Sequence, residues 1–224
     1  MLILSLFGLA SPALSQVAAS ATVVSDYIYR GFSLSDGRPA VSLILTADDS
    51  RGLYGGGSLI AEAGQGRGPE LLGQEEYLGY AFRLSNGRSL DLGVHNLNYL
   101  SYDYPSSLED AAEVYIGWVD GLLNGYLHYS PNYFQPGAQT IYAEVNGAIR
   151  LPRPWRLFGH VGALTPLRDE RNGKELYDVR AGMAAEFRHA EIQVAWTNAR
   201  PSLEYVSDEV AGRGVVAVTL ALFF

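Results

Sequence analysis

Apolar and polar residues alternate with a period of two along most of this chain. From Tyr177 to Phe187 the odd positions are all apolar, whereas the even positions are charged or small. The same alternation recurs in Ile141–Ile149 and Glu191–Thr197, and again in Glu113–Trp118. Because successive side chains of a β-strand point to opposite faces, the pattern predicts strands with one apolar and one polar face.

Turn sequences divide the chain into roughly twelve predicted strands of about 9–13 residues, close to the length that a tilted membrane strand needs. Short turns are predicted at Asp48–Gly52, Ser85–Arg88, Asp120–Gly125, Leu151–Pro154 and Arg188–His189. Longer polar stretches alternate with them at Glu62–Glu75, Leu100–Asp110, Pro131–Gln139, Thr165–Glu175 and Ala199–Gly214, and only the first such connection, Ser35–Pro39, is predicted to be short. Short turns at one end and long loops at the other are typical of outer-membrane barrels.

Two places interrupt the regular strand pattern. The alternation within Leu90–Leu100 changes phase near His95–Asn96, which predicts a β-bulge. Gly55–Gly57 predicts a flexible bend in a strand, and Gly64–Gly68, followed by Pro69, predicts an exposed loop. Neither glycine-rich stretch has the lysine and helix start of a phosphate-binding loop.

A soluble β-sandwich or a lipocalin-like barrel would also alternate, but sandwich strands average only about 5–6 residues. The C-terminus favours the membrane barrel, because alternation continues through Val216, Val218, Leu220 and Leu222 to the final Phe224. A closed barrel pairs its last strand with its first and so leaves no open edge in the membrane. The predicted fold is therefore an all-β, antiparallel, transmembrane outer-membrane barrel. A terminal aromatic residue also resembles the signal read by the barrel assembly machinery, which makes that machinery an expected partner.

The N-terminal residues predict a signal peptide. The segment Met1–Ser25 has no charged residue, and its apolar stretch from Leu2 to Leu14 is too short for a membrane anchor, which needs about 20 residues. Ala13 and Ser15 are small residues at the positions that a signal peptidase reads, although a positively charged start is missing. We expect a signal peptide at 1–15, a single barrel at 16–224, export through the periplasm and contact with outer-membrane lipid.

Composition and charge exclude several classes of function. With 16 Lys and Arg against 24 Asp and Glu, the net charge is −8, which disfavours nucleic acid as a partner. The chain has no cysteine, so disulfides, thiolate metal sites and cysteine nucleophiles are excluded.

The region from Val24 to Pro39 carries a resemblance to a known family. It contains Val24-Ser25-Asp26-Tyr27 and then Arg30-Gly31 and Ser35-Asp36-Gly37-Arg38-Pro39. This motif closely resembles the opening of the TorF family, proteobacterial outer-membrane proteins named as porins. Glu113–Gly117 and Tyr129–Phe134 are weaker matches to later parts of that family's pattern. The resemblance implies a pore and assigns no catalytic or ligand-binding residue.

Without the family, the same region is interpreted as the first strand of the barrel. Asp26, Ile28, Arg30 and Phe32 would share one face, where opposite charges could pair with each other or with neighbours inside the barrel. Asp36-Gly37 predicts a tight turn with positive φ angles. We expect an internal ion pair that holds the seam between the first and last strands; a role in ion selectivity is the alternative.

Histidines and aromatic residues are the remaining candidates for chemistry. His95, His128 and His160 fall on polar faces, but no G-x-S-x-G sequence is present and no histidine pair has metal-ligand spacing. The sequence therefore predicts no catalytic residue, no cofactor and no metal. Aromatic residues near predicted strand ends are expected to form two girdles at the membrane surfaces, namely Tyr27, Tyr29, Tyr99, Tyr102, Tyr104, Trp118, Tyr133, Phe134 and Trp155.

The predicted function is passive diffusion of small solutes or ions through a polar lumen. Twelve strands lie between barrels filled by side chains and wide channels, so a non-conducting structural or docking barrel remains an alternative. An outer-membrane lipid-modifying enzyme is a further alternative, expected only if a histidine meets a serine or an acid near a rim of the membrane. The residues expected to line the lumen are Asp26, Arg30, Asp91, Glu113, Tyr142, Glu144, Asn146, Arg156, His160, Asp178, Arg180, Glu186, Glu191 and Gln193.

Overall fold

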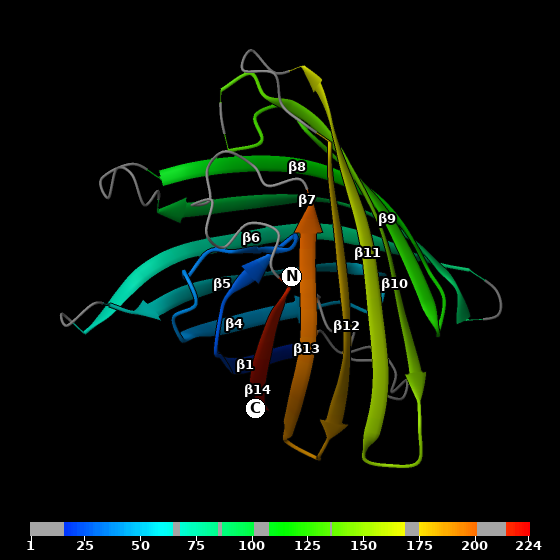
Figure 1. The fold of residues 1–224 in the computed structure, drawn as a ribbon. Helices are drawn as coiled ribbons and strands as arrows, with labels where there is room; N and C mark the ends of the chain where they lie inside the picture. Colours follow the sequence, from blue (N-terminus) through cyan, green and yellow to red (C-terminus); the bar gives the residue numbers. More distant parts are fainter. Residues whose placement is uncertain are drawn as a thin grey trace.

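Twelve antiparallel strands form a closed barrel in the computed structural model, which describes residues 16–64, 68–84, 87–100, 108–134, 136–168, 175–200 and 214–224 (Figure 1). The predicted fold class and the predicted strand number are confirmed. The wall strands are β1 (Gln16–Val24), β4 (Ala40–Asp48), β5 (Leu53–Ala63), β6 (Pro69–Arg83), β7 (Ser89–Leu100), β8 (Leu108–Val119), β9 (Leu123–Ser130), β10 (Gln139–Arg150), β11 (Trp155–Arg168), β12 (Leu176–Glu186), β13 (Ala190–Arg200) and β14 (Val215–Phe223).

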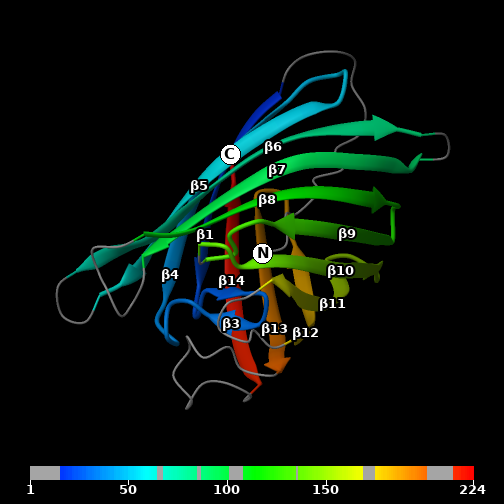
Figure 2. The ribbon, with the colours of Figure 1, turned by 90° about the horizontal axis from the view of Figure 1, so that it is seen from above.

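The barrel closes where its first and last strands meet. β1 pairs with β14 on one side and with β4 on the other, and the Phe224 amide donates to the Ala19 carbonyl at 2.9 Å. In Figure 2 the red β14 accordingly lies beside the blue β1. The alternating C-terminal strand therefore leaves no free edge, as the sequence predicts.

In the part of the chain that the structure describes, no helix is long and apolar enough to cross a membrane.

Short and long connections lie at opposite ends of the barrel. We call the end of the barrel where β1 begins and β14 ends the short-turn end. The connections there are residues 49–52, 84–88, 120–122, 151–154 and 187–189. The other connections lie at the long-connection end. The predicted loop at Glu62–Glu75 is much shorter than expected, because β5 continues to Ala63 and β6 already begins at Pro69.

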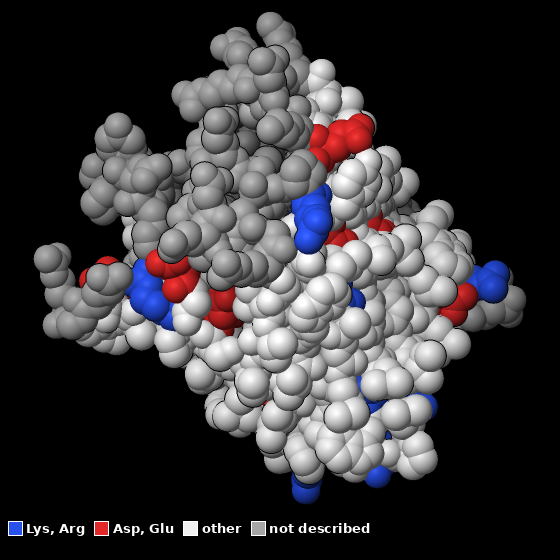
Figure 3. Space-filling view, in the orientation of Figure 1, with Lys and Arg blue, Asp and Glu red and all other residues white. Residues whose placement is uncertain are grey.

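The barrel is apolar outside and polar inside. On β8 the side chains of Val114 and Ile116 are 53% and 50% exposed, whereas that of Glu113, on the same strand but facing the interior, is only 3% exposed. Most of the barrel wall visible in Figure 3 is free of charged atoms. This inside-out distribution is the one a membrane barrel with a polar lumen needs.

Two predicted irregularities are wrong. β7 pairs with β6 and β8 in a continuous register through His95 and Asn96, so there is no bulge. The hydrophobic pattern changes phase there because the barrel interior itself becomes apolar, and Leu97 and Tyr99 point into it. Gly55–Gly57 is not a bend either, since these residues pair regularly with both neighbouring strands.

Residues Val24–Pro39 do not form the predicted first wall strand. The chain leaves the wall after Val24 and returns to it at Ala40, and we call the fifteen residues between them, Ser25–Pro39, the inward segment. It contains the two-residue strands β2 (Ile28–Tyr29) and β3 (Phe32–Ser33), which pair with each other. The predicted turn is confirmed, because Asp36 and Gly37 have φ angles of 53° and 70°. The connection between β1 and β4 is therefore long, and the prediction that the first connection at this end is short is wrong.

The inward segment fills the long-connection end of the lumen. Tyr27 and Tyr29 pack with Ile60, Leu97 and Tyr99 in a buried cluster, in which Ile60 and Leu97 are fully inaccessible. The girdle prediction is therefore wrong for all three of these tyrosines. Tyr133 and Phe134 also pack against this cluster, whereas Trp118 and Trp155 are exposed on the outside. Tyr102 and Tyr104 lie outside the described residues, as does the predicted signal peptide.

Candidate functional site within the lumen

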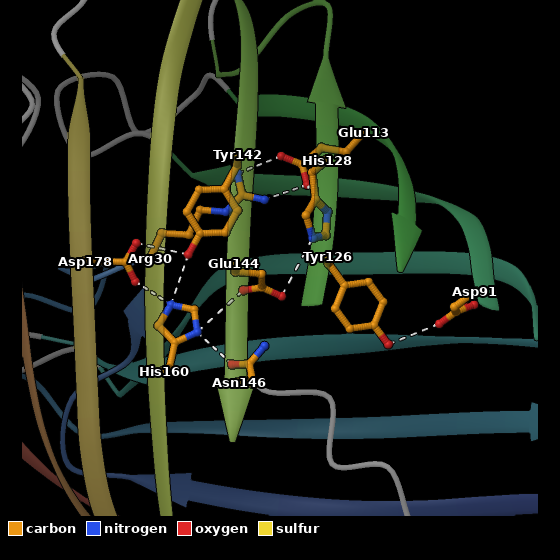
Figure 4. Close-up of polar contacts among 10 residues, drawn as sticks. All are labelled: Arg30, Asp91, Glu113, Tyr126, His128, Tyr142, Glu144, Asn146, His160 and Asp178. Carbon is orange, nitrogen blue, oxygen red and sulfur yellow. Dashed lines mark hydrogen bonds and ion pairs between the residues drawn. The ribbon is translucent and has the colours of Figure 1, made fainter. Parts of the chain in front are cut away.

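Arg30, at the tip of the inward segment, is joined to the opposite wall of the barrel. Its guanidinium makes two hydrogen bonds of 2.8 Å to the carboxylate of Glu113 on β8 and lies 3.9 Å from the ring centre of Tyr142 on β10 (Figure 4). A bidentate arginine–carboxylate pair is a strong and geometrically specific contact. The expected ion pair is thus present, but it crosses the lumen and does not hold the β1–β14 seam, so that part of the prediction is wrong.

Burial alone would lower the pKa of the Arg30 guanidinium, but the Glu113 carboxylate outweighs this effect and the pKa is raised. Arg30 therefore remains charged throughout the ordinary pH range.

A glycine allows this tip to lie against the other side of the barrel. Gly31 has a φ of 83°, and a Cβ there would lie 2.5 Å from the Cβ of Ala199 on β13. Any other residue at this position would both strain the backbone and push the segment away from the wall. Together, Arg30 and Gly31 hold the inward segment between β8 and β13.

Histidines and carboxylates alternate along the middle of the wall. His128 on β9 lies within ion-pair distance of Glu113 and Glu144, at 3.3 and 3.7 Å. His160 on β11 lies 3.6 Å from Glu144 and 2.7 Å from Asp178 on β12. Asn146 Oδ1 and the Tyr142 hydroxyl also lie within hydrogen-bond distance of the His160 ring, as Figure 4 shows.

A second ionic group lies near the short-turn end. Arg156 on β11 pairs with Glu186 on β12 at 2.5 Å and with Glu191 on β13 at 2.6 Å. Gln193 donates to the same Glu191, and Arg180 in turn donates to Gln193 at 3.4 Å. This group therefore links three neighbouring strands on one side of the lumen.

Tyrosines surround Asp91 on the opposite side. The hydroxyls of Tyr54 on β5 and Tyr126 on β9 donate to the Asp91 carboxylate on β7, at 2.6 and 3.2 Å. The hydroxyls of Tyr54 and Tyr115 are hydrogen-bonded to each other at 2.6 Å. Sequence reasoning placed Asp91 in the lumen but missed these tyrosines. Their signal was the period of two, which puts Tyr115 on the same face as Glu113.

The structure places the predicted lumen residues on the inside of the barrel but divides them into separate groups. Most of them join the three groups described above. Asp26 lies apart, within the inward segment, where Ser33 and Ser35 donate to its carboxylate. Glu186 is the most open of the acids, with 45% of its side chain exposed. Whether these residues meet a passing solute stays a prediction.

His160 meets the acid Asp178 and the amide of Asn146, as the enzyme alternative requires, but it lies in the middle of the wall and not near a rim. The hydroxyl beside it, however, is the phenol of Tyr142, and that hydroxyl also contacts Asp178. Among the described residues no group of three or more histidines, cysteines and acids is arranged to hold a metal ion.

Comparison with known proteins gives a family without an assigned activity. Residues 9–220 match the model of a family described as "Bacterial protein of unknown function (Gcw_chp)". The chain belongs to this family. No curated protein matches the chain.

Solved structures with the same fold have low sequence identity to this chain. The KdgM porin aligns with a TM-score of 0.57 at 10% identity, over 92% of this chain and 99% of its own. The NanC porin aligns with a TM-score of 0.54 at 9% identity, over 93% of this chain and 99% of its own. At such identities the likeness establishes the barrel fold alone. The family match does not name TorF, so that resemblance stays a prediction.

Proposed function

We propose that the protein is an outer-membrane channel of the TorF type for passive diffusion of small solutes or ions, narrowed by its inward segment. One observation carries the proposal: a closed barrel exposes an apolar wall and turns its charges inward, as seen for Ile116 and Glu113. An apolar wall is stable in lipid, whereas a charged interior provides a path for hydrated solutes. No step of catalysis is needed for this function.

The position of the inward segment supports a constriction at the long-connection end. The cluster around Tyr27 and Tyr99 is almost inaccessible to solvent, and Glu75 accepts hydrogen bonds from both of their hydroxyls. Tyr54 and Tyr126, nearer the short-turn end, point inward and yet stay partly accessible. These contacts support a lumen that is narrower at the long-connection end than toward the short-turn end.

The buried cluster at the long-connection end also favours a second candidate function. A barrel sealed by the inward segment would not conduct, and it would act through its surface as a structural or docking protein.

Conductance of the refolded full chain in a planar lipid bilayer distinguishes the two. Val24 and Ala40 are directly paired, so an Asn-Gly turn can replace residues 25–39 without disturbing the wall. For the channel we expect discrete conductance steps from the native protein and larger steps from the variant without the segment. If the native protein shows no conductance steps and the variant does, the barrel is sealed by the inward segment. If neither protein conducts, although electrophoresis with and without heating shows that both are folded, the proposed channel is overturned.

A further inference from the structure

The inward-facing charges of the described residues are predominantly negative. Carboxylates there outnumber arginines, and Arg30, Arg38 and Arg156 are each already held in an ion pair with one of them. Among the buried residues, the carboxylates are those of Asp26, Glu62, Glu75, Asp91, Glu113, Asp178 and Glu191, and the arginines are Arg30 and Arg156. Such an interior attracts cations and repels anions.

Asp91 differs from the other acids by its partners. Tyrosine hydroxyls donate to it, and within the described part of the chain no arginine or histidine forms an ion pair with it. Its negative charge is therefore not neutralised locally. A phenol that donates to a carboxylate also becomes more electron-rich, which strengthens the attraction of its ring for a cation.

Four tyrosine rings form a continuous group around Asp91, which we call the tyrosine wall: Tyr54, Tyr77, Tyr115 and Tyr126. Asp91 and Tyr115 are buried, whereas Tyr54, Tyr77 and Tyr126 stay partly accessible and offer the rings that a ligand could reach. Tyr54 packs on Tyr77 with ring centres 6.1 Å apart, and Tyr115 packs on Tyr126 at 6.0 Å. The hydroxyl contact between Tyr54 and Tyr115 joins the two pairs. These residues come from four strands that surround β7 on both sides.

Glycines let these rings lie along the barrel wall and not across the lumen. Each tyrosine stands directly opposite a glycine of a neighbouring strand, as Tyr115 does to Gly93 and Tyr126 to Gly117. A Cβ at Gly93 would lie 2.3 Å from the Tyr115 hydroxyl, and one at Gly117 would lie 2.2 Å from the Tyr126 ring. Tyr54 over Gly79 and Tyr77 over Gly56 repeat the arrangement. The rings thus lie against the wall of the lumen and extend less far across it than they would over larger residues.

We propose that the tyrosine wall around Asp91 is a binding surface for small organic cations, such as quaternary ammonium compounds, on their way through the lumen. This inference rests on the proposed channel for its transport role, whereas binding itself can be measured without conduction. Electron-rich aromatic faces beside an acidic group are the usual means by which proteins recognise quaternary ammonium groups.

The test compares choline with its neutral isostere, 3,3-dimethyl-1-butanol, as ligands of the folded full chain in detergent micelles. Ligand-observed NMR should show that choline binds roughly five- to tenfold more tightly than the isostere, the difference expected from cation–aromatic attraction. Asp91→Asn and Tyr126→Ala should remove this preference, whereas Tyr126→Phe, which keeps the ring, should retain most of it. Glu76→Gln is the matched control, because Glu76 is exposed and its Asn96 partner lies on the outer face, so this change should have no effect.

Reversal potentials in a planar bilayer form the second arm. A choline chloride gradient should give a cation-selective potential that is reduced in Asp91→Asn and unchanged in Glu76→Gln. Equal binding of choline and its isostere, or equal effects of Asp91→Asn and Glu76→Gln, would overturn the proposed surface even if the barrel conducts. Selective choline binding by a barrel that stays silent would instead support the surface and overturn the channel.

Discussion

Among single residues, the charged side chains buried in the lumen matter most, because each needs polar or oppositely charged partners close by. Arg30 and Glu113 are separated by 83 positions in the chain, and both side chains are almost completely buried. A buried charge without a partner is costly, so each of these residues depends on the other. The pair therefore helps to keep the inward segment inside the barrel.

Arg30→Gln should destabilise the protein by about 3–5 kcal/mol, because it leaves the Glu113 carboxylate buried without its cation. Urea unfolding of the refolded protein in detergent measures this loss. The control is Arg88→Gln, which removes an exposed 3.0 Å pair with Asp120 at a short turn and should cost less than about 1 kcal/mol. Equal losses in the two variants would contradict the role assigned to Arg30.

At the scale of elements, each wall strand separates two environments by simple alternation. On β13, Val194 and Trp196 are 47% and 44% exposed, whereas Gln193 and Thr197 are buried in the interior. Along β7 the alternation of direction continues, although the polarity of the two faces reverses near the long-connection end. The inward segment causes this reversal, because its tyrosines make the neighbouring interior apolar.

Val194→Arg should destabilise the folded barrel by about 2–4 kcal/mol if this strand crosses lipid with Val194 near the midplane. Unfolding by urea in lipid vesicles measures the difference. Val194→Leu keeps an apolar side chain at the same position and should change stability by less than about 1.5 kcal/mol. A small effect of the arginine in vesicles would show that β13 does not face hydrocarbon there.

At the scale of the whole molecule, the barrel is stable only as a closed ring. Every wall strand has two hydrogen-bonded neighbours, and β14 supplies the closing contacts to both β1 and β13. Closure also fixes the space into which the inward segment folds. The lumen and its constriction therefore both depend on a contact between the two ends of the chain.

Removal of residues 214–224 should prevent formation of a heat-modifiable barrel, since β1 and β13 would be left as open edges in lipid. Phe224→Ala keeps the pairing of β14 and should still refold in detergent. If the assembly machinery recognises the terminal aromatic, as we propose, the same Phe224→Ala change should lower the amount of protein inserted into the outer membrane of cells. A folded barrel without β14 would contradict the requirement for closure.

The alternation of apolar and polar residues along the chain is enough to predict the wall of the barrel. Alternation from Tyr177 to Phe187 reveals which side chains share a face, and the pattern up to Phe224 reveals that the last strand is paired. These properties are local, because the direction of a strand side chain depends only on its position in the strand. The approximate strand number and the polar inner face followed from the same local rule.

The contents of the lumen, in contrast, depend on contacts between residues that are far apart in the chain. The motif from Val24 to Pro39 reads locally as another strand, and nothing nearby in the chain reveals that Arg30 meets Glu113 or that Tyr54 and Tyr126 meet Asp91. These contacts join residues from opposite or neighbouring walls that come together only after closure. The interior of a barrel is therefore set by which strands face each other across the ring, a long-range property that periodicity does not contain.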